Sequence, residues 1–362
     1  MPRSRRISRI GLLAAPLLLA ASLLANAQEV EIKTEFAPAA IGEPGVAIHL
    51  DNDLFTGSGD DSDYSWGATF TIGSPEPGPL SAPLDRARRG IASLLPDREA
   101  AAVSRATQFG MIAMTPDDLK SADALPDDRP YASLVFLTSS ELRIDTSGER
   151  SRFTSFTVGL LGTGVAETLQ RGVHQVQGGI VPNGWSHQVS DGGEPTARFV
   201  HAEQWVLGDT DTHAGTLRQT KLTLAASAGY LTEASAAVSM RWGRIATPWW
   251  SFNPELGDYS PAPVAPVNGF SFGGSPEVYG FVGARVKARA YSALLQGQFR
   301  HSDVRVASDD LARFQVEAWA GVTSAFSEWS LSYSIHVASR EIDRAPADRM
   351  LLWASLSFAR AF

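Results

Sequence analysis

Apolar and polar residues alternate with a period of two along most of this chain. In one segment, large apolar residues stand at every second position from Trp329 to Val337, with Ser330, Ser332 and His336 among the residues between them. Such alternation predicts β-strands. The same pattern predicts strands near 45–52, 64–74, 105–114, 131–143, 151–161, 197–208, 216–229, 233–244, 277–290, 313–324, 328–340 and 350–362. Another candidate, 292–300, is broken by Gln and Gly and is not counted.

The two faces of these strands differ in a way that is typical of a membrane barrel. One face carries large apolar side chains, and the other is small and polar but includes charges such as Arg285, Lys287 and Arg289. A soluble sandwich also alternates, but its large apolar residues point inward. Charges on the second face suit a polar lumen inside a lipid-facing band. We therefore expect a transmembrane antiparallel up-and-down β-barrel of about twelve strands, in which this basic ladder pairs with inward acids such as Glu317.

The N-terminus has the pattern of a secretory signal peptide. Four arginines within the first nine residues precede an apolar run from Ile10 to Leu24, and Ala25-Asn26-Ala27 fits a small-x-small cleavage site. The run is short for a membrane anchor, which is the alternative interpretation. Residues 1–27 are therefore predicted to be removed on export, which leaves residues 28–362 as the barrel.

Composition excludes several classes of function. The chain has no Cys, which excludes thiol catalysis, disulfides and Cys-based metal sites. A net charge of -8 argues against nucleic acid as a partner, because such binders present a basic face.

An even strand number places both termini at the periplasmic end of a bacterial barrel. Two long connections, 75–104 with a helical stretch at 84–95 and the Pro-rich 246–276, then fall at that end. The loops 52–64, 115–130 and 162–196 fall at the extracellular rim. Long loops of this kind often carry function.

Five polar residues in these three loops or directly beside them form a candidate site: Asn52, Asp53, Ser65, Lys120 and His174. Ester hydrolysis needs a base, which an imidazole provides near neutral pH. It also needs positive charge where the oxyanion develops, from an ammonium group or a bound cation. Asp and Asn oxygens suit calcium. The 51–63 cluster does not fit an EF-hand, because Phe55 stands at a ligand position.

Some features have simpler interpretations. The acidic run Asp60, Asp61 and Asp63 is expected to be a solvated loop, and Asp127–Tyr131 is interpreted as a turn into a strand in which Arg129 pairs locally. The string Gly269–Gly273 matches the serine-hydrolase G-x-S-x-G motif. It lacks the following helix that this motif requires, so we do not regard it as catalytic.

Several short stretches, in order, resemble the outer-membrane lipid A 3'-O-deacylase family. They are Asn52-Asp53, Asp63-Tyr64-Ser65-x-Gly67, Thr115-Pro116 with Lys120, Asp128–Ala132, Gly159–Gly162, Gln170 with His174, Gly184-Trp185 with Gln188, and Ser339–Glu341. The order and spacing of these stretches carry the resemblance, which spans most of the chain after the signal peptide.

The resemblance implies calcium-dependent hydrolysis of the ester-linked 3'-acyloxyacyl group of lipid A in lipopolysaccharide. It implies that His174 activates water, that Lys120 and the metal stabilise the oxyanion, and that Asn52, Asp53 and Ser65 shape the metal and water site, with Asp53 as a metal ligand. Ser65 stands where Thr also occurs, and the spacing from Pro116 to Lys120 differs by about one residue. An acidic residue that follows the His in this family is absent, so Glu167 or Asp191 is a candidate replacement.

Two alternatives remain open at the level of sequence. A non-enzymatic outer-membrane barrel, such as a narrow pore or a structural protein, would not need His174 and Lys120 at the same rim as Asp53. An outer-membrane phospholipase or acyltransferase would need a nucleophilic Ser, and Ser65 is the Ser closest to the proposed site.

Overall fold

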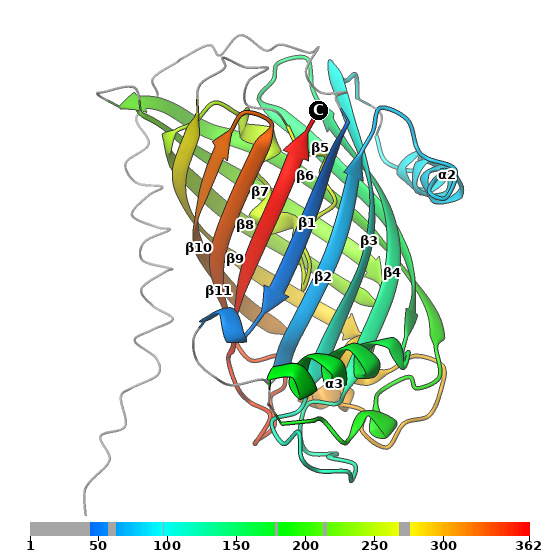
Figure 1. Ribbon diagram of the computed structural model, residues 1–362. Coiled ribbons are helices and arrows are strands. Elements are labelled where there is room, and N and C mark those ends of the chain that lie inside the picture. The colour runs from blue at the N-terminus through cyan, green and yellow to red at the C-terminus, as the bar shows by residue number, and fades with distance from the viewer. Residues whose placement is uncertain (1–43, 57–62, 97, 178–179, 213–215, 268–275) are drawn as a thin grey trace, which may run out of the picture.

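The computed structural model describes residues 44–56, 63–96, 98–177, 180–212, 216–267 and 276–362. Its described part forms a closed antiparallel barrel in which each strand pairs with its neighbours in sequence and β1 pairs with β12 (Figure 1). The strands are β1 Gly45–Asn52, β2 Asp63–Gly73, β3 Ala102–Thr115, β4 Ala132–Ile144, β5 Arg150–Leu161, β6 Glu194–Thr212, β7 Thr216–Gly229, β8 Leu231–Arg244, β9 Glu277–Ser292, β10 Phe314–Phe326, β11 Trp329–Ala338 and β12 Leu351–Ala361.

The sequence-based fold prediction is confirmed. All twelve predicted strands are present, with ends that shift by a few residues, and the excluded 292–300 segment forms the short helix α4 (Ala293–Gln296) and a loop. The largest shift is in β6, which is longer at both ends than the predicted 197–208. The predicted signal peptide lies outside the described residues. None of the described helices is long and apolar enough to span a membrane.

The outer surface of the barrel is an apolar band. Side chains that alternate with lumen-facing residues on the strands remain exposed although they are large and apolar, among them Ile48, Leu50, Phe70, Ile72, Phe109, Leu160, Val286, Leu331, Leu352 and Phe358. Burial in lipid removes such side chains from water, which is the arrangement that a membrane barrel requires. The predicted lipid-facing band is therefore present.

The lumen is filled by the segment that connects β8 to β9. Residues 245–267, which include η4 (Trp249–Ser251) and η5 (Pro254–Leu256), leave the sheet beside the chain termini and fold back inside the barrel. Strands around the barrel bind this segment: Gln108 on β3 donates to the Pro261 carbonyl (3.1 Å), and Ser239 on β8 donates to Glu255 (2.7 Å). The described part of the predicted 246–276 insertion is therefore a plug within the lumen, and residues 268–275 lie outside the described residues.

Charge pairing holds the plug in place. Asp258 of the plug accepts from Arg198 (2.7 Å) and Arg285 (3.0 Å), and Glu317 binds Arg285 (2.6 Å) and Lys287 (3.1 Å). The expected pairing of the basic ladder with Glu317 is confirmed. Buried charges of this kind are tolerated only when paired. A plug in the lumen also disfavours an open pore, which was one of the alternatives left open by the sequence.

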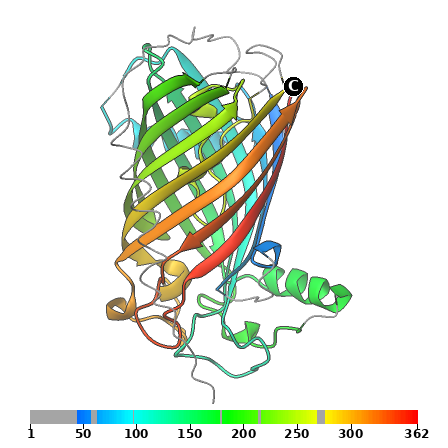
Figure 2. The same cartoon turned by 90° about the vertical axis from the view of Figure 1, so that its left-hand side faces the viewer.

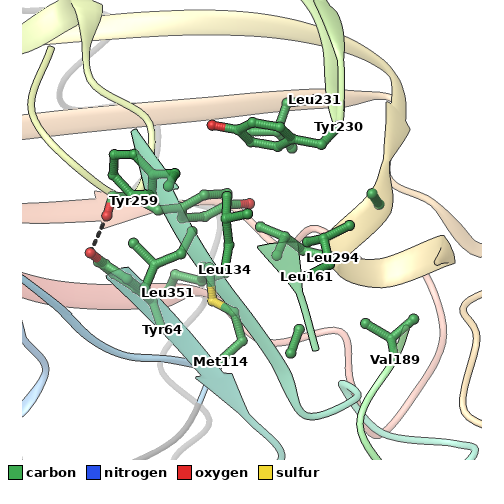
Figure 3. Close-up of a cluster of buried hydrophobic side chains, with 14 of the residues drawn as sticks. Tyr64, Met114, Leu134, Leu161, Val189, Tyr230, Leu231, Tyr259, Leu294 and Leu351 are labelled. Atoms are coloured by element: carbon green, nitrogen blue, oxygen red, sulfur yellow. Dashed lines mark hydrogen bonds between the residues drawn. The ribbon is translucent and has the colours of Figure 1, made fainter. Parts of the chain in front are cut away.

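An apolar cluster packs inside the barrel between the plug and the wall. Figure 3 shows Tyr64, Met114, Leu134 and Tyr259 gathered there from β2, β3, β4 and the plug. The Tyr64 hydroxyl donates to the Tyr259 carbonyl and to Asp51 Oδ2 (2.7 Å). The plug is thus bound to the barrel wall by apolar packing and by hydrogen bonds.

We call the barrel end that carries the described chain ends the terminal rim and the opposite end the distal rim. The helix α2 (Ala82–Ala92) lies at the terminal rim, and the predicted helix in the 75–104 connection is confirmed. The distal rim carries η2 (Leu54–Thr56), α3 (Val165–Gln177), η3 (Trp185–His187), α4 and η7 (Ser308–Asp310). Figure 1 shows α2 and α3 at opposite ends of the barrel, both outside its wall.

Candidate functional site

The helix α3 lies outside the barrel at the distal rim, as Figure 2 shows, and contacts the outer wall through Ala166. Ala166, Gln170 and His174 recur every four residues and form its buried face. Residues at this spacing lie on one side of a helix. His174 therefore lies on the same face of α3 as Ala166 and Gln170.

An apolar cluster joins α3 to the wall. Its members come from outward positions of β3, from the two long distal loops and from α3 itself: Met111, Ala113, Leu119, Tyr131, Ala166 and Trp185. The Tyr131 and Trp185 rings lie 4.8 Å apart, and Trp185 Nε1 donates to Gln170 Oε1 (3.0 Å). Trp185 therefore links the loop, the wall and the helix face that carries His174.

The imidazole of His174 is held in one orientation. Nδ1 is hydrogen-bonded to the Ile180 carbonyl, and the side chain is almost fully buried. A carbonyl only accepts, so Nδ1 carries the hydrogen of a neutral imidazole and Nε2 carries the lone pair. This tautomer is the one that lets Nε2 take a proton from a water molecule.

Asn52 and Ser65 are brought together at the ends of β1 and β2. Asn52 Nδ2 donates to the Ser65 carbonyl (3.1 Å), and Ser65 Oγ shares a hydrogen bond with Thr115 Oγ1 (2.6 Å). The β2–β3 register shifts between Tyr64 and Trp66, which makes Ser65 the extra residue of a β-bulge. Bulges re-aim side chains and are frequent beside active sites.

Asp53 directly follows β1 and is buried. Its carbonyl accepts from the backbone N–H and the hydroxyl of Thr56, at 3.0 and 2.7 Å, which closes the η2 turn. Asp53 thus lies at the rim beside Asn52, as the sequence predicted.

Lys120 lies in the loop between β3 and β4 and is exposed. Its backbone N–H donates to Asp118 Oδ1 (2.9 Å), and its carbonyl accepts from Asn183 Nδ2 (3.3 Å). The adjacent Leu119 belongs to the apolar cluster that holds α3. The segments of Lys120 and His174 therefore belong to one packed assembly on the outer wall.

Arg129 is the centre of a buried ion-pair network that sequence patterns missed. It binds Asp63 (3.1 Å) and Glu341, and Arg349 binds Asp63 (3.0 Å) and Asp128 (2.8 Å). The prediction that Asp63 belongs to a solvated loop is wrong, because its carboxylate is buried between two arginines. The prediction that Arg129 pairs locally is also wrong, because its partner Glu341 is 212 residues away in the sequence. Asp60 and Asp61 lie outside the described residues.

The segment 162–196, which was predicted to be a loop, contains α3. The missed signal was an apolar repeat, Val165, Leu169 and Val173, supported by Glu167 and Arg171 at i, i+4. Those two residues form an ion pair of 2.9 Å.

The described residues contain no group of three or more His, Cys, Asp or Glu side chains placed to hold a metal ion. Of the two proposed replacement ligands, Glu167 binds Arg171, and Asp191 accepts from Gln188 Nε2 (3.0 Å). Asn52 ends β1 directly before Asp53, and hydrogen bonds join Asn52 to Ser65 and Ser65 to Thr115. Amide and hydroxyl oxygens of this kind are compatible with a hard cation.

A cavity of about 280 Å³ lies elsewhere, in the lumen. His49 lines it, and its ring binds Asp51 Oδ1 (2.7 Å) and Ser357. These are inward residues of β1 and β12, on the opposite side of the wall from α3. The Gly269–Gly273 string lies outside the described residues.

Comparisons with known proteins agree with the barrel fold. The family described as Outer membrane protein LpxR matches residues 12–362. LpxR from Salmonella typhimurium superimposes with a TM-score of 0.67 at 13% identity, over 88% of this chain and 100% of that one.

Two other barrels are more distant. The β domain of the Bordetella autotransporter BrkA gives a TM-score of 0.39 at 12% identity, over 89% of this chain and 100% of its own. An outer membrane channel from Pseudomonas putida F1 gives 0.40 at 8% identity, over 92% and 100%. A comparison with curated protein sequences finds no match. The family match and the closed barrel identify the chain as an integral outer-membrane β-barrel that belongs to the family of the outer membrane protein LpxR.

Proposed function

We propose that this protein is a lipid A deacylase that hydrolyses the ester bond of the 3'-acyloxyacyl group at the extracellular rim. The observation that carries the proposal is the position of the site. Asn52, Asp53, Ser65, Lys120 and His174 belong to elements at the distal rim, and α3, which carries His174, packs through Ala166 on the outer side of the wall. A lipid substrate reaches that side directly from the membrane.

The free face of α3 supports a lipid substrate. Val165, Leu169 and Val173 recur every four residues on it and are 49%, 47% and 50% exposed. An apolar stripe at the rim of a membrane barrel suits contact with acyl chains. The helix therefore presents its apolar stripe to lipid.

The proposed reaction uses His174 as a general base. Nε2 takes a proton from water as the water oxygen attacks the ester carbonyl carbon, and the imidazolium returns that proton to the departing sugar oxygen as the acyl C–O bond breaks. The Lys120 ammonium stabilises the negative charge that develops on the carbonyl oxygen. Asn52 and Ser65 are suited to orient the water by hydrogen bonds.

Calcium is a further part of the proposal. Asp53 would hold the ion together with the oxygens of Asn52 and Ser65, and a bound cation would add positive charge at the oxyanion. With a single carboxylate in this set, the remaining ligands would be neutral oxygens.

The test is lipid A mass spectrometry on cells that express the protein. We expect the wild type to remove one acyloxyacyl group, and calcium chelation in isolated membranes to stop the reaction. His174→Ala should lower the rate by roughly two to four orders of magnitude. His187→Ala is the matched control, because His187 is an exposed histidine of the same loop.

Every variant is first checked for the heat-resistant migration of a folded barrel. Unchanged lipid A with folded wild-type protein and calcium would overturn the proposed function. Full activity of His174→Ala would remove His174 from the mechanism while leaving the substrate assignment intact.

A further inference from the structure

The helix α2 packs on the outer face of the barrel wall near the terminal rim. On β4, Ser140 donates to the plug and Leu142 packs against it, so both point into the lumen. Glu141 lies between them and therefore points outward, as does Thr154, its direct partner on β5. Arg88 of α2 binds Thr154 Oγ1 (2.8 Å) and Glu141 Oε2 (3.1 Å). These contacts place α2 outside the barrel.

The face of α2 that meets the wall is charged. Arg88 also binds Asp85 (2.7 Å), and the two side chains are each 1% exposed. Arg105 on β3 completes the buried group through Glu141 (3.0 Å). These outward positions lie beyond the apolar band, which reaches Phe109 on the same strand. The helix α2 therefore covers a polar part of the outer wall, at the level along the barrel axis where the apolar band ends.

An apolar stripe runs along α2 beside this charged face. Leu84, Ala87 and Ile91 are spaced three and four residues apart, which places them on one side of α2. Leu80 and Leu94 lie in the turns just before and just after the helix. Leu80 and Leu94 are 82% and 83% exposed, and Leu84 and Ile91 are partly exposed. A helix that buries charges and exposes leucines is oriented against its hydrophobic preference in water.

The other flank of α2 is cationic. Arg86 and Arg89 project there and are exposed, with Arg98 exposed on the neighbouring loop and Arg143 partly exposed on the wall. The acids that approach this group, Asp85, Glu141 and Glu203, are much less exposed than the arginines. The accessible charge beside the apolar stripe is therefore positive.

We propose that α2 is an interfacial membrane helix that inserts its leucine stripe among the acyl chains of the periplasmic leaflet and binds anionic phospholipid headgroups with Arg86 and Arg89. Apolar and cationic flanks on one helix are the features of helices that lie in a membrane interface. The end of the apolar band against which α2 packs is the level where headgroups begin. The proposal is independent of the deacylase site, which lies at the other rim.

The chain contains no Cys, so single-cysteine variants carry one label each. Ile91→Cys probes the apolar stripe, and Arg86→Cys, on the opposite side of α2, is the matched control. Each variant is labelled with the fluorophore NBD and reconstituted in vesicles of phosphatidylethanolamine and phosphatidylglycerol with a nitroxide-labelled lipid. Heat-resistant migration confirms that both barrels are folded.

We expect a blue-shifted emission at position 91 and several-fold stronger quenching by the nitroxide lipid than at position 86. Quenching at position 91 should weaken when phosphatidylcholine replaces phosphatidylglycerol. Equal quenching at both positions, or access of aqueous iodide to position 91, would overturn the proposal. Cross-linking of Ile91→Cys to a second copy, with no quenching by lipid, would assign the stripe to a protein interface instead.

Discussion

Replacing Arg129 by Met tests whether the buried ion-pair network holds the distal rim together. Arg129 is 2% exposed and connects the β3–β4 loop to Asp63 at the start of β2 and to Glu341 in the β11–β12 loop. Breaking a buried ion pair by removing one partner costs about 3–5 kcal/mol. Asp63 keeps Arg349 (3.0 Å) and Glu341 keeps Arg289, so we expect the low end, about 3 kcal/mol.

The assay is urea unfolding of the barrel in lipid vesicles, followed by tryptophan fluorescence. A loss of about 3 kcal/mol corresponds to about a 150-fold change in the unfolding equilibrium. Arg340→Met is the control, because Arg340 pairs with Asp343 (2.5 Å) on the surface and its loss should cost less than about 1 kcal/mol. Adding Glu341→Gln to Arg129→Met should recover part of the stability. If the Arg129 and Arg340 variants unfold alike, the network does not stabilise the rim.

Two further predictions concern acid and packing. Burial alone would raise the pKa of Glu341, but Arg129 and Arg289 outweigh it and hold the pKa at about 2, against an ordinary 4.5. The stabilisation from this carboxylate is therefore complete above pH 4.5 and is lost as the pH falls toward 2. Glu341→Gln should make the free energy of unfolding less dependent on pH between 4.5 and 2. The same pH dependence in the variant and the wild type would contradict the low pKa of Glu341. Gly184→Ala should reduce activity and lower the free energy of unfolding by about 1–3 kcal/mol, because the new Cβ would meet the Tyr131 ring at 2.6 Å. Gly172→Ala is the control, because Gly172 lies on the open surface of α3 and its replacement should not destabilise the fold. Similar losses of stability in the two variants would refute this reasoning.

The sequence by itself determined the barrel. Alternation is a local property with a period of two, so it can be read from each strand separately, and it located all twelve strands and the polarity of both faces. The topology that follows from an even count then placed Asn52, Ser65, Lys120 and His174 at one rim, where the structure has them. Those predictions needed no knowledge of long-range contacts.

Tertiary structure alone decided which polar residues are buried and which residues they pair with. Asp63 looked like a solvated loop residue because its partners, Arg129 and Arg349, are far away in sequence and come beside it only when the barrel closes. The Pro-rich 246–267 segment gave no local sign that it enters the lumen. The outward position of α2 likewise depends on Arg88 meeting Glu141 and Thr154, which are contributed by two other strands. Ion pairs and packed loops depend on closure of the whole barrel, and a period of two carries no information about them.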